Sequence, residues 1–96
     1  MKTCIIIPAL NEENKIGEVI DKLLKLISEK DIILVIDDGS KDNTKELAIS
    51  KGCEVLSNVK NMGKGFSIRR GFEYALKTGS QIMVTLDADG QHDPNE

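Results

Sequence analysis

Two carboxylates stand two positions apart near the end of the chain, in Asp87-Ala88-Asp89. They directly follow Ile82–Leu86, an apolar run that predicts a strand, so both side chains leave the carboxyl end of that strand. Carboxylate oxygens suit a hard cation such as Mg²⁺ or Mn²⁺, and ligand phosphates can complete its shell. An Asp-x-Asp pair alone is common in solvated turns, so the metal interpretation depends on its neighbours. Gln91 offers a further oxygen ligand, and His92 is either a ligand or a solvated side chain.

A second acidic pair occurs in Asp37-Asp38-Gly39-Ser40, after the apolar run Ile32–Ile36. A carboxylate at a strand end can accept hydrogen bonds from a base or ribose, as in dinucleotide-binding folds. The alternative is a solvated turn whose Asp or Ser caps the next helix. Position beside the other acidic loop favours the binding interpretation.

The segment Asn61–Gly65 combines glycine with Lys64 ahead of a helical pattern. It matches neither Gly-x-x-x-x-Gly-Lys-[Ser/Thr] nor Gly-x-Gly-x-x-Gly, because position 68 is Ile. It still predicts a lysine-bearing approach to a helix amino terminus, which favours phosphate. Arg69 and Arg70 add positive charge, with a solvated helix face as the alternative for at least one of them.

Alternating strand and helix patterns must position these residues. Apolar runs predict strands at 4–7, 32–36, 53–56 and 82–86. Three- and four-residue spacings predict a first helix at 13–29 and a second from 42 or 43 to 50. A third helix, ending before Gly79, would have an apolar face made of Ile68, Phe72, Ala75 and Leu76. This β-α-β-α-β-α-β order favours a Rossmann-like three-layer α/β fold with a mainly parallel sheet. Ligands bind such sheets at the carboxyl ends of the strands, so residues 8–12, 37–40 and 87–91 should share one rim.

Composition narrows the class of protein. The chain of 96 residues has 40% hydrophobic and 30% charged residues, as an ordinary single domain does, and no apolar run that could span a bilayer. A net charge of −3 and 3% aromatic residues argue against nucleic acid as a partner. No signal peptide is indicated, so we expect a cytoplasmic location. Cys4 and Cys53 lie in or beside apolar runs and are expected to be reduced core thiols.

Four motifs in this order and spacing resemble a known family: Pro8-Ala9-Leu10-Asn11-Glu12-Glu13, Asp37-Asp38-Gly39-Ser40, Asn61-x-Gly63-Lys64-Gly65, and Asp87-Ala88-Asp89-Gly90-Gln91-His92-Asp93-Pro94. The chain resembles a family 2 glycosyltransferase of the polyprenyl-phosphate (dolichyl-phosphate) mannosyl- or glucosyltransferase branch, with a GT-A type fold. The resemblance implies a nucleotide-diphosphate sugar donor such as GDP-mannose or UDP-glucose, a divalent metal (Mg²⁺ or Mn²⁺) and inversion at the anomeric carbon.

The resemblance also implies roles for individual residues. Pro8, Leu10 and Glu12 would line the nucleoside pocket, Ile36 and Asp38 would contact the base or ribose, and Asp87, Ala88 and Asp89 would hold the diphosphate and metal, with Gln91 as a further metal ligand. Asp89 is the predicted catalytic residue, and Lys64 is expected to bind phosphate. Leu10 departs from the aromatic residue often found at its position.

Family enzymes are longer than this chain, and their acceptor site follows the Asp-x-Asp segment. We therefore expect residues 1–96 to be a single partial domain that binds the donor but is inactive alone. A longer protein would use a polyprenyl-phosphate acceptor and associate with the cytoplasmic face of the membrane. The last strand would have an open edge, through which a homodimer could form.

Two other classes remain as alternatives. A sugar nucleotidyltransferase would show a glycine-rich basic loop after its first strand, where this chain has Asn11-Glu12-Glu13. A non-enzymatic metal- or nucleotide-binding regulatory module, such as a phosphoacceptor receiver domain, would place an acidic pair after the first strand and an Asp after the third. Neither strand end here has that pattern.

Overall fold

A computed structural model describes residues 1–90 of the chain and contains one four-stranded parallel sheet in the order β3-β2-β1-β4. The elements are β1 (Thr3–Ala9), α1 (Ile16–Leu24), β2 (Ile32–Asp37), α2 (Thr44–Ser50), β3 (Glu54–Ser57), α3 (Lys64–Lys77) and β4 (Ile82–Thr85). This confirms the predicted alternation and the parallel α/β sheet. None of the helices within residues 1–90 is long and apolar enough to cross a membrane.

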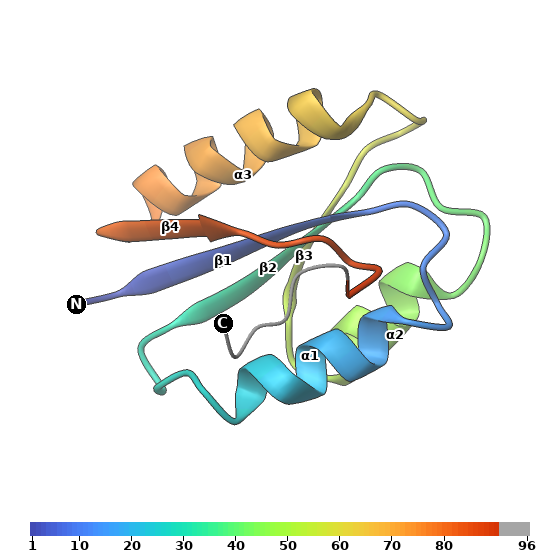
Figure 1. The fold of residues 1–96 in the computed structure, drawn as a ribbon. Coiled ribbons are helices and arrows are strands. Elements are labelled where there is room, and N and C mark those ends of the chain that lie inside the picture. The colour runs from blue at the N-terminus through green and yellow to red at the C-terminus, as the bar shows by residue number, and fades with distance from the viewer. Residues whose placement is uncertain (91–96) are drawn as a thin grey trace.

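The sheet is covered on both faces, with α3 on one side and α1 and α2 on the other (Figure 1). Alternate residues of β1 therefore enter different cores. Ile5 and Ile7 pack in the cluster that contains the buried residues of α1, whereas Cys4 and Ile6 pack in the cluster that contains Ala75 of α3. Burial on both faces explains why the central strands read as continuous apolar runs rather than alternating ones.

Helix α1 is shorter than the spacing of apolar residues predicts. It ends at Leu24. Beyond it, the carboxylate of Asp31 accepts the backbone N–H of Ser28 at 2.9 Å and that of Thr3 at 3.0 Å, which stabilises the turn before β2. These hydrogen bonds hold the pKa of Asp31 below its ordinary value. Ile27 still packs against the core from outside the helix.

Helix α3 buries a different face from the one predicted. Its buried residues are Ser67, Gly71 and Ala75, while Phe72 is 39% and Leu76 68% exposed, so the prediction was right only for Ala75. The helix lies so close to the sheet that a Cβ on Gly71 would come within 2.5 Å of Cγ2 of Ile6. Small side chains permit this approach, and larger ones would prevent it.

Both cysteines are free thiols, as expected. Cys4 is fully buried, and Cys53 is half-buried against the cluster under α1 and α2. Burial raises the pKa of Cys53 to about 11, so its thiol stays protonated and unreactive at neutral pH.

Candidate functional site

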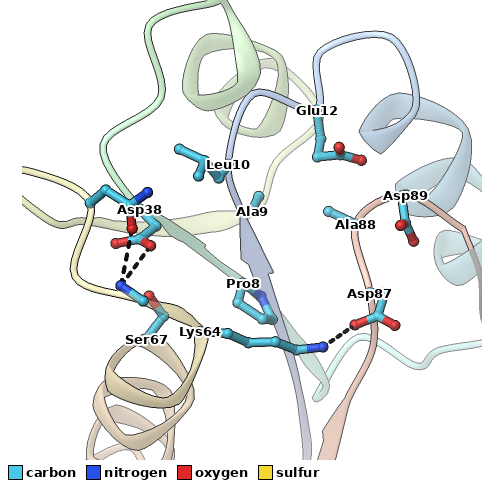
Figure 2. A pocket seen from close by; sticks show the side chains of 12 residues that line it. Pro8, Ala9, Leu10, Glu12, Asp38, Lys64, Ser67, Asp87, Ala88 and Asp89 are labelled. Carbon is cyan, nitrogen blue, oxygen red and sulfur yellow. Dashed lines mark hydrogen bonds and ion pairs between the residues drawn. The ribbon is translucent and has the colours of Figure 1, made fainter.

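A cavity of about 310 Å³ lies at the carboxyl ends of the strands, where the predicted loops meet. Its lining residues are Pro8, Ala9, Leu10, Glu12, Asp38, Asn61, Gly63, Lys64, Ser67, Asp87, Ala88 and Asp89. Residues from all three predicted rim segments are present, together with the loop before α3. Figure 2 shows Leu10 and Asp38 toward one end of the cavity and Glu12 and Asp89 toward the other.

Reciprocal hydrogen bonds join the loop after β1 to the loop after β2. The Asn11 N–H donates to Oγ of Ser40 at 2.9 Å, and Oδ1 of Asn11 accepts the Lys41 N–H at 2.8 Å. The Glu12 N–H donates to Oγ1 of the buried Thr44 at 2.9 Å. Asn11 itself adopts a positive φ of 53°, which Asn tolerates better than most residues. These contacts fix Leu10 and Glu12 at the cavity.

Asp42 precedes Asn43, the N-cap residue of α2, and strengthens the same junction. Its carboxylate accepts the Thr44 N–H at 3.0 Å and the Glu13 N–H at 3.2 Å. Partial desolvation acts to raise the pKa of Asp42, but the hydrogen bonds from Thr44 and Glu13 outweigh it and lower the pKa. The N–H of Thr44, the first residue of α2, is therefore satisfied by Asp42 and not by Asp38, which makes other contacts.

Asp38 anchors the loop that leads to α3. Its buried carboxylate accepts the side-chain amide of Asn58 at 2.8 Å, the Met62 N–H at 2.7 Å and the Gly63 N–H at 3.0 Å. A carboxylate offers about four lone-pair positions, so one remains for a ligand donor. The adjacent turn passes so close that a Cβ on Gly39, whose φ is 79°, would lie 2.8 Å from the carbonyl carbon of Lys60.

Lys64, the first residue of α3, carries a cation to the acidic end of the cavity. Its Nζ lies 2.7 Å from Oδ1 of Asp87 (Figure 2). The lysine side chain is 64% exposed and that of Asp87 20%. An ion pair this exposed on one side contributes little to stability, so its lysine can turn to another anion at small cost.

Glu12 contributes a buried carboxylate oxygen at the same end as Ala88 and Asp89. Within residues 1–90, Oε2 of Glu12 has no hydrogen-bond partner. A buried oxygen of this kind is costly unless a donor or cation reaches it, so this end of the cavity suits a cation or a ligand hydroxyl. No group of three or more His, Cys, Asp or Glu among the described residues could hold a metal by itself. The available set fits Mg²⁺ or Mn²⁺ held by one or two carboxylates and by ligand phosphates.

Most of the predicted binding residues meet in this cavity, but Ile36 does not. Its side chain is fully buried in the core cluster under α3 and does not line the cavity. Gln91 and His92 lie outside the described residues. Ser67 also lines the cavity but was not predicted; its Oγ accepts the side-chain amide of Asn58 at 2.9 Å. Its position one helical turn after Lys64 was the available signal.

The comparison with known proteins agrees with this arrangement. The family model described as "Glycosyl transferase family 2" matches residues 4–96. The chain belongs to glycosyl transferase family 2. It is 36% identical to the UDP-N-acetylglucosamine--dolichyl-phosphate N-acetylglucosaminyltransferase of Methanococcus voltae, over 96% of this chain and 43% of the relative. It is 33% identical to the undecaprenyl-phosphate mannosyltransferase of Micrococcus luteus, over 100% of this chain and 41% of the relative.

Solved structures of similar sequence share the fold. Glucosyl-3-phosphoglycerate synthase from Mycobacterium tuberculosis, in complex with Mn²⁺, UDP and glucosyl-3-phosphoglycerate, superposes with a TM-score of 0.74 at 33% identity. The match covers 91% of this chain and 33% of that enzyme. The expected GT-A type fold is thereby confirmed. The chain spans about two fifths of the length of the two curated relatives above.

Proposed function

We propose that this chain forms the donor-binding part of a hexosyltransferase, which holds a nucleotide-diphosphate sugar with a divalent cation. The observation that supports this most is a single cavity lined by Asp38 toward one end and by Lys64, Asp87 and Asp89 toward the other. A nucleoside diphosphate needs both kinds of contact, one for its base or ribose and one for its charge.

The nucleoside would lie at the end formed by Pro8, Leu10 and Asp38. Pro8 and Leu10 give an apolar wall, and Leu10 is 38% exposed and open to a ligand. The fourth acceptor position of the Asp38 carboxylate suits an N–H of the base or a ribose hydroxyl. Ile36 pairs with Pro8 in the sheet, and its buried side chain belongs to the core cluster under α3.

The diphosphate would lie toward the other end, where the Lys64 side chain meets Asp87. The ammonium of Lys64 would attract phosphate there, whereas the amino terminus of α3 lies at the Asp38 end, where Asp38 already accepts the Gly63 N–H. Asp87 and Asp89 would hold the metal, with Gln91 a further predicted ligand; when bound, the metal neutralises charge that develops on the leaving nucleoside diphosphate. Asp89 is proposed as the catalytic member of this set, because the metal must be held while the sugar leaves.

The proposed acceptor is a polyprenyl phosphate, the class named in the two sequence relatives above. A phosphate oxygen is already ionised and can attack from the opposite face without a strong base, which agrees with an inverting transfer. A hydroxyl acceptor would need a general base. Phosphoglycerate is the alternative acceptor to include in assays, because the mycobacterial enzyme was crystallised with glucosyl-3-phosphoglycerate. The cytoplasmic location and the inactivity of the 96-residue chain alone stay predictions.

Calorimetric titration tests the proposal directly. The chain is titrated with GDP, UDP and their hexose conjugates, with and without Mn²⁺, and the titrations are repeated on Asp89→Ala. We expect metal-dependent binding that Asp89→Ala abolishes. The control Asp21→Ala removes a carboxylate from the surface of α1 and should bind as wild type does.

A second variant distinguishes the contributions that the two ends of the cavity make to ligand binding. Lys64→Met should weaken nucleoside-diphosphate binding about 10- to 100-fold, because it removes one charge-assisted hydrogen bond of about 1.5–3 kcal/mol, and should leave free nucleoside binding unchanged. Donor binding by the folded chain that needs no metal, or that survives Asp89→Ala, would contradict the proposal.

A further inference from the structure

Positive charge is concentrated in one stretch of the chain, residues 57–72. It contains four of the 13 Lys and Arg residues (Lys60, Lys64, Arg69 and Arg70) and none of the 16 Asp and Glu residues. The nearest acidic residues on either side are Glu54 and Glu73. Since the whole chain has a net charge of −3, this stretch is a local exception to an acidic protein. Only Lys64 of these four cations belongs to the donor cavity.

The same stretch exposes three large apolar side chains. Val59 is 103% exposed, and Met62 and Phe66 are each 42% exposed. With Lys60 and Arg70 they line a largely apolar groove of about 510 Å³ between the end of β3 and the start of α3. We call Val59, Lys60, Met62, Phe66 and Arg70 the β3–α3 surface.

Hydrogen bonds fix the backbone beneath the β3–α3 surface. Nη1 of Arg70 donates to the Ser57 carbonyl at 2.7 Å and to Oδ1 of Asn58 at 2.9 Å. Asp38 holds the Met62 N–H from the other side of the loop. The exposed apolar side chains are therefore presented by a braced loop, and exposure of this kind marks interaction sites.

This surface adjoins the donor cavity at the carboxyl rim of the sheet. Alternate residues of one loop serve the two sites, with Asn61 and Gly63 in the donor cavity and Lys60 and Met62 in the groove. The loop projects beyond the ends of the strands (Figure 1). It follows β3, which is at the opposite edge of the sheet from β4. Whatever docks on the groove is held beside the donor.

We propose that the β3–α3 surface docks on an anionic lipid bilayer. Val59, Met62 and Phe66 enter the interface, while Lys60 and the guanidinium donors of Arg70 other than Nη1 contact lipid phosphates, as basic and apolar side chains do together at membranes. Three apolar side chains are too few for a stable protein interface, which buries about 800 Å² per partner. The link to catalysis rests on the proposed function, since docking here would hold the donor cavity at the level of a lipid-borne phosphate acceptor.

Vesicle flotation tests the docking. The chain is mixed with vesicles of phosphatidylcholine alone, or of phosphatidylcholine and phosphatidylglycerol in equal parts, at increasing salt. We expect binding to the anionic vesicles that weakens with salt. Lys60→Gln should weaken it about fivefold, which corresponds to about 1 kcal/mol per cation at such a surface. Val59→Ser should weaken it as well, without loss of fold, because Val59 is fully exposed.

Matched controls change the same residue types elsewhere. Ile49→Ser replaces an apolar side chain of α2 that is 52% exposed, and Lys30→Gln replaces an exposed lysine at the opposite end of the sheet. Both should bind vesicles as wild type does. Absence of vesicle binding, equal binding to both vesicle types, or indifference to Lys60→Gln and Val59→Ser would overturn the docking. Self-association that the same two variants abolish would assign the surface to a second copy instead.

Donor titration without lipid keeps this inference separate from the proposed function. Lys60→Gln and Val59→Ser should bind donor as wild type does, because neither side chain lines the donor cavity. Donor binding without vesicle binding would overturn the docking alone. Vesicle binding without donor binding would overturn the proposed function alone.

Discussion

Asp38 is the residue on which the shape of the donor cavity most depends. Three donors converge on its buried carboxylate from Asn58, Met62 and Gly63. Through the last two it sets the path of the loop that carries Lys64 to the cavity. A residue expected to contact a base or ribose is thus also the anchor of a neighbouring wall.

Replacing Asp38 by Asn should lower the free energy of unfolding by about 1–3 kcal/mol, because the new amide N–H₂ must face a buried donor that the carboxylate had satisfied. Urea denaturation measures the change. Asp37→Asn is the control, since Asp37 is equally buried but accepts a longer bond, 3.3 Å from the Ser40 N–H. Equal losses in the two variants, or a loss below about 0.5 kcal/mol for Asp38→Asn, would contradict the anchoring role.

At the level of single residues, the sequence predicted which residues line the cavity better than it predicted the hydrogen bonds that hold the cavity walls in place. The acidic pairs and Lys64 stand in turns after apolar runs, and parallel strands bring such turns together. Ile36 was misplaced because its position next to Asp37 and Asp38 does not reveal that its side chain points into the core. The contacts of Asp38 span 20 to 25 residues of chain, and no local pattern reports such contacts.

Among the elements, α3 shows why close packing against a sheet needs small residues. Gly71 faces Ile6, which is fully buried and branched, and no space exists for a Cβ between them. Apolar periodicity predicted the helix but not its buried face, because Ser67, Gly71 and Ala75 are less hydrophobic than Phe72 and Leu76. Length and turn signals predicted the order of the elements, whereas the turn after α1 includes a contact between Asp31 and the distant Thr3, which no local pattern reports.

We expect Gly71→Ala to destabilise the chain even though alanine favours helix by about 1 kcal/mol over glycine. Overpacking against Ile6 should cost about 1–3 kcal/mol, so the net loss falls between zero and about 2 kcal/mol. Gly65→Ala in the first turn of α3 is the control, since a Cβ there meets no atom within 4 Å, and it should be neutral or stabilising.

A double-mutant cycle identifies the cause of that loss. In an Ile6→Ala background the obstructing Cγ2 is absent, so Gly71→Ala should become neutral or stabilising there. Thermal unfolding of the wild type, the two single variants and the double variant gives the coupling free energy between positions 6 and 71. An unchanged cost of Gly71→Ala in that background would show that Ile6 does not cause it.

For the whole molecule, the edges of the sheet differ in what they expose. The edge strand β3 leads into the braced β3–α3 surface, whereas β4 pairs with β1 and has no strand on its other side within residues 1–90 (Figure 1). Ile82 and Val84 of β4 are 37% and 40% exposed, so the strand offers both unpaired backbone groups and apolar side chains. Such an edge is a template for another strand.

We therefore expect the chain to self-associate through β4 as its concentration rises. The hydrogen bonds between β1 and β4 show which substitution would block this self-association. The N–H groups of Ile82 and Leu86 donate to Lys2 and Ile6, so, by alternation along a parallel strand, the N–H of Thr85 points away from β1. Thr85→Pro removes that outward donor and should shift the chain toward monomer in sedimentation velocity with little loss of stability. Val84→Pro, one residue earlier, removes a donor that faces β1 and should instead destabilise the fold by about 1–3 kcal/mol, because a carbonyl of β1 loses its partner. A chain that stays monomeric at all concentrations, or self-association that Thr85→Pro leaves unchanged, would show that β4 is not a pairing edge, because only backbone pairing on its outer side depends on that N–H.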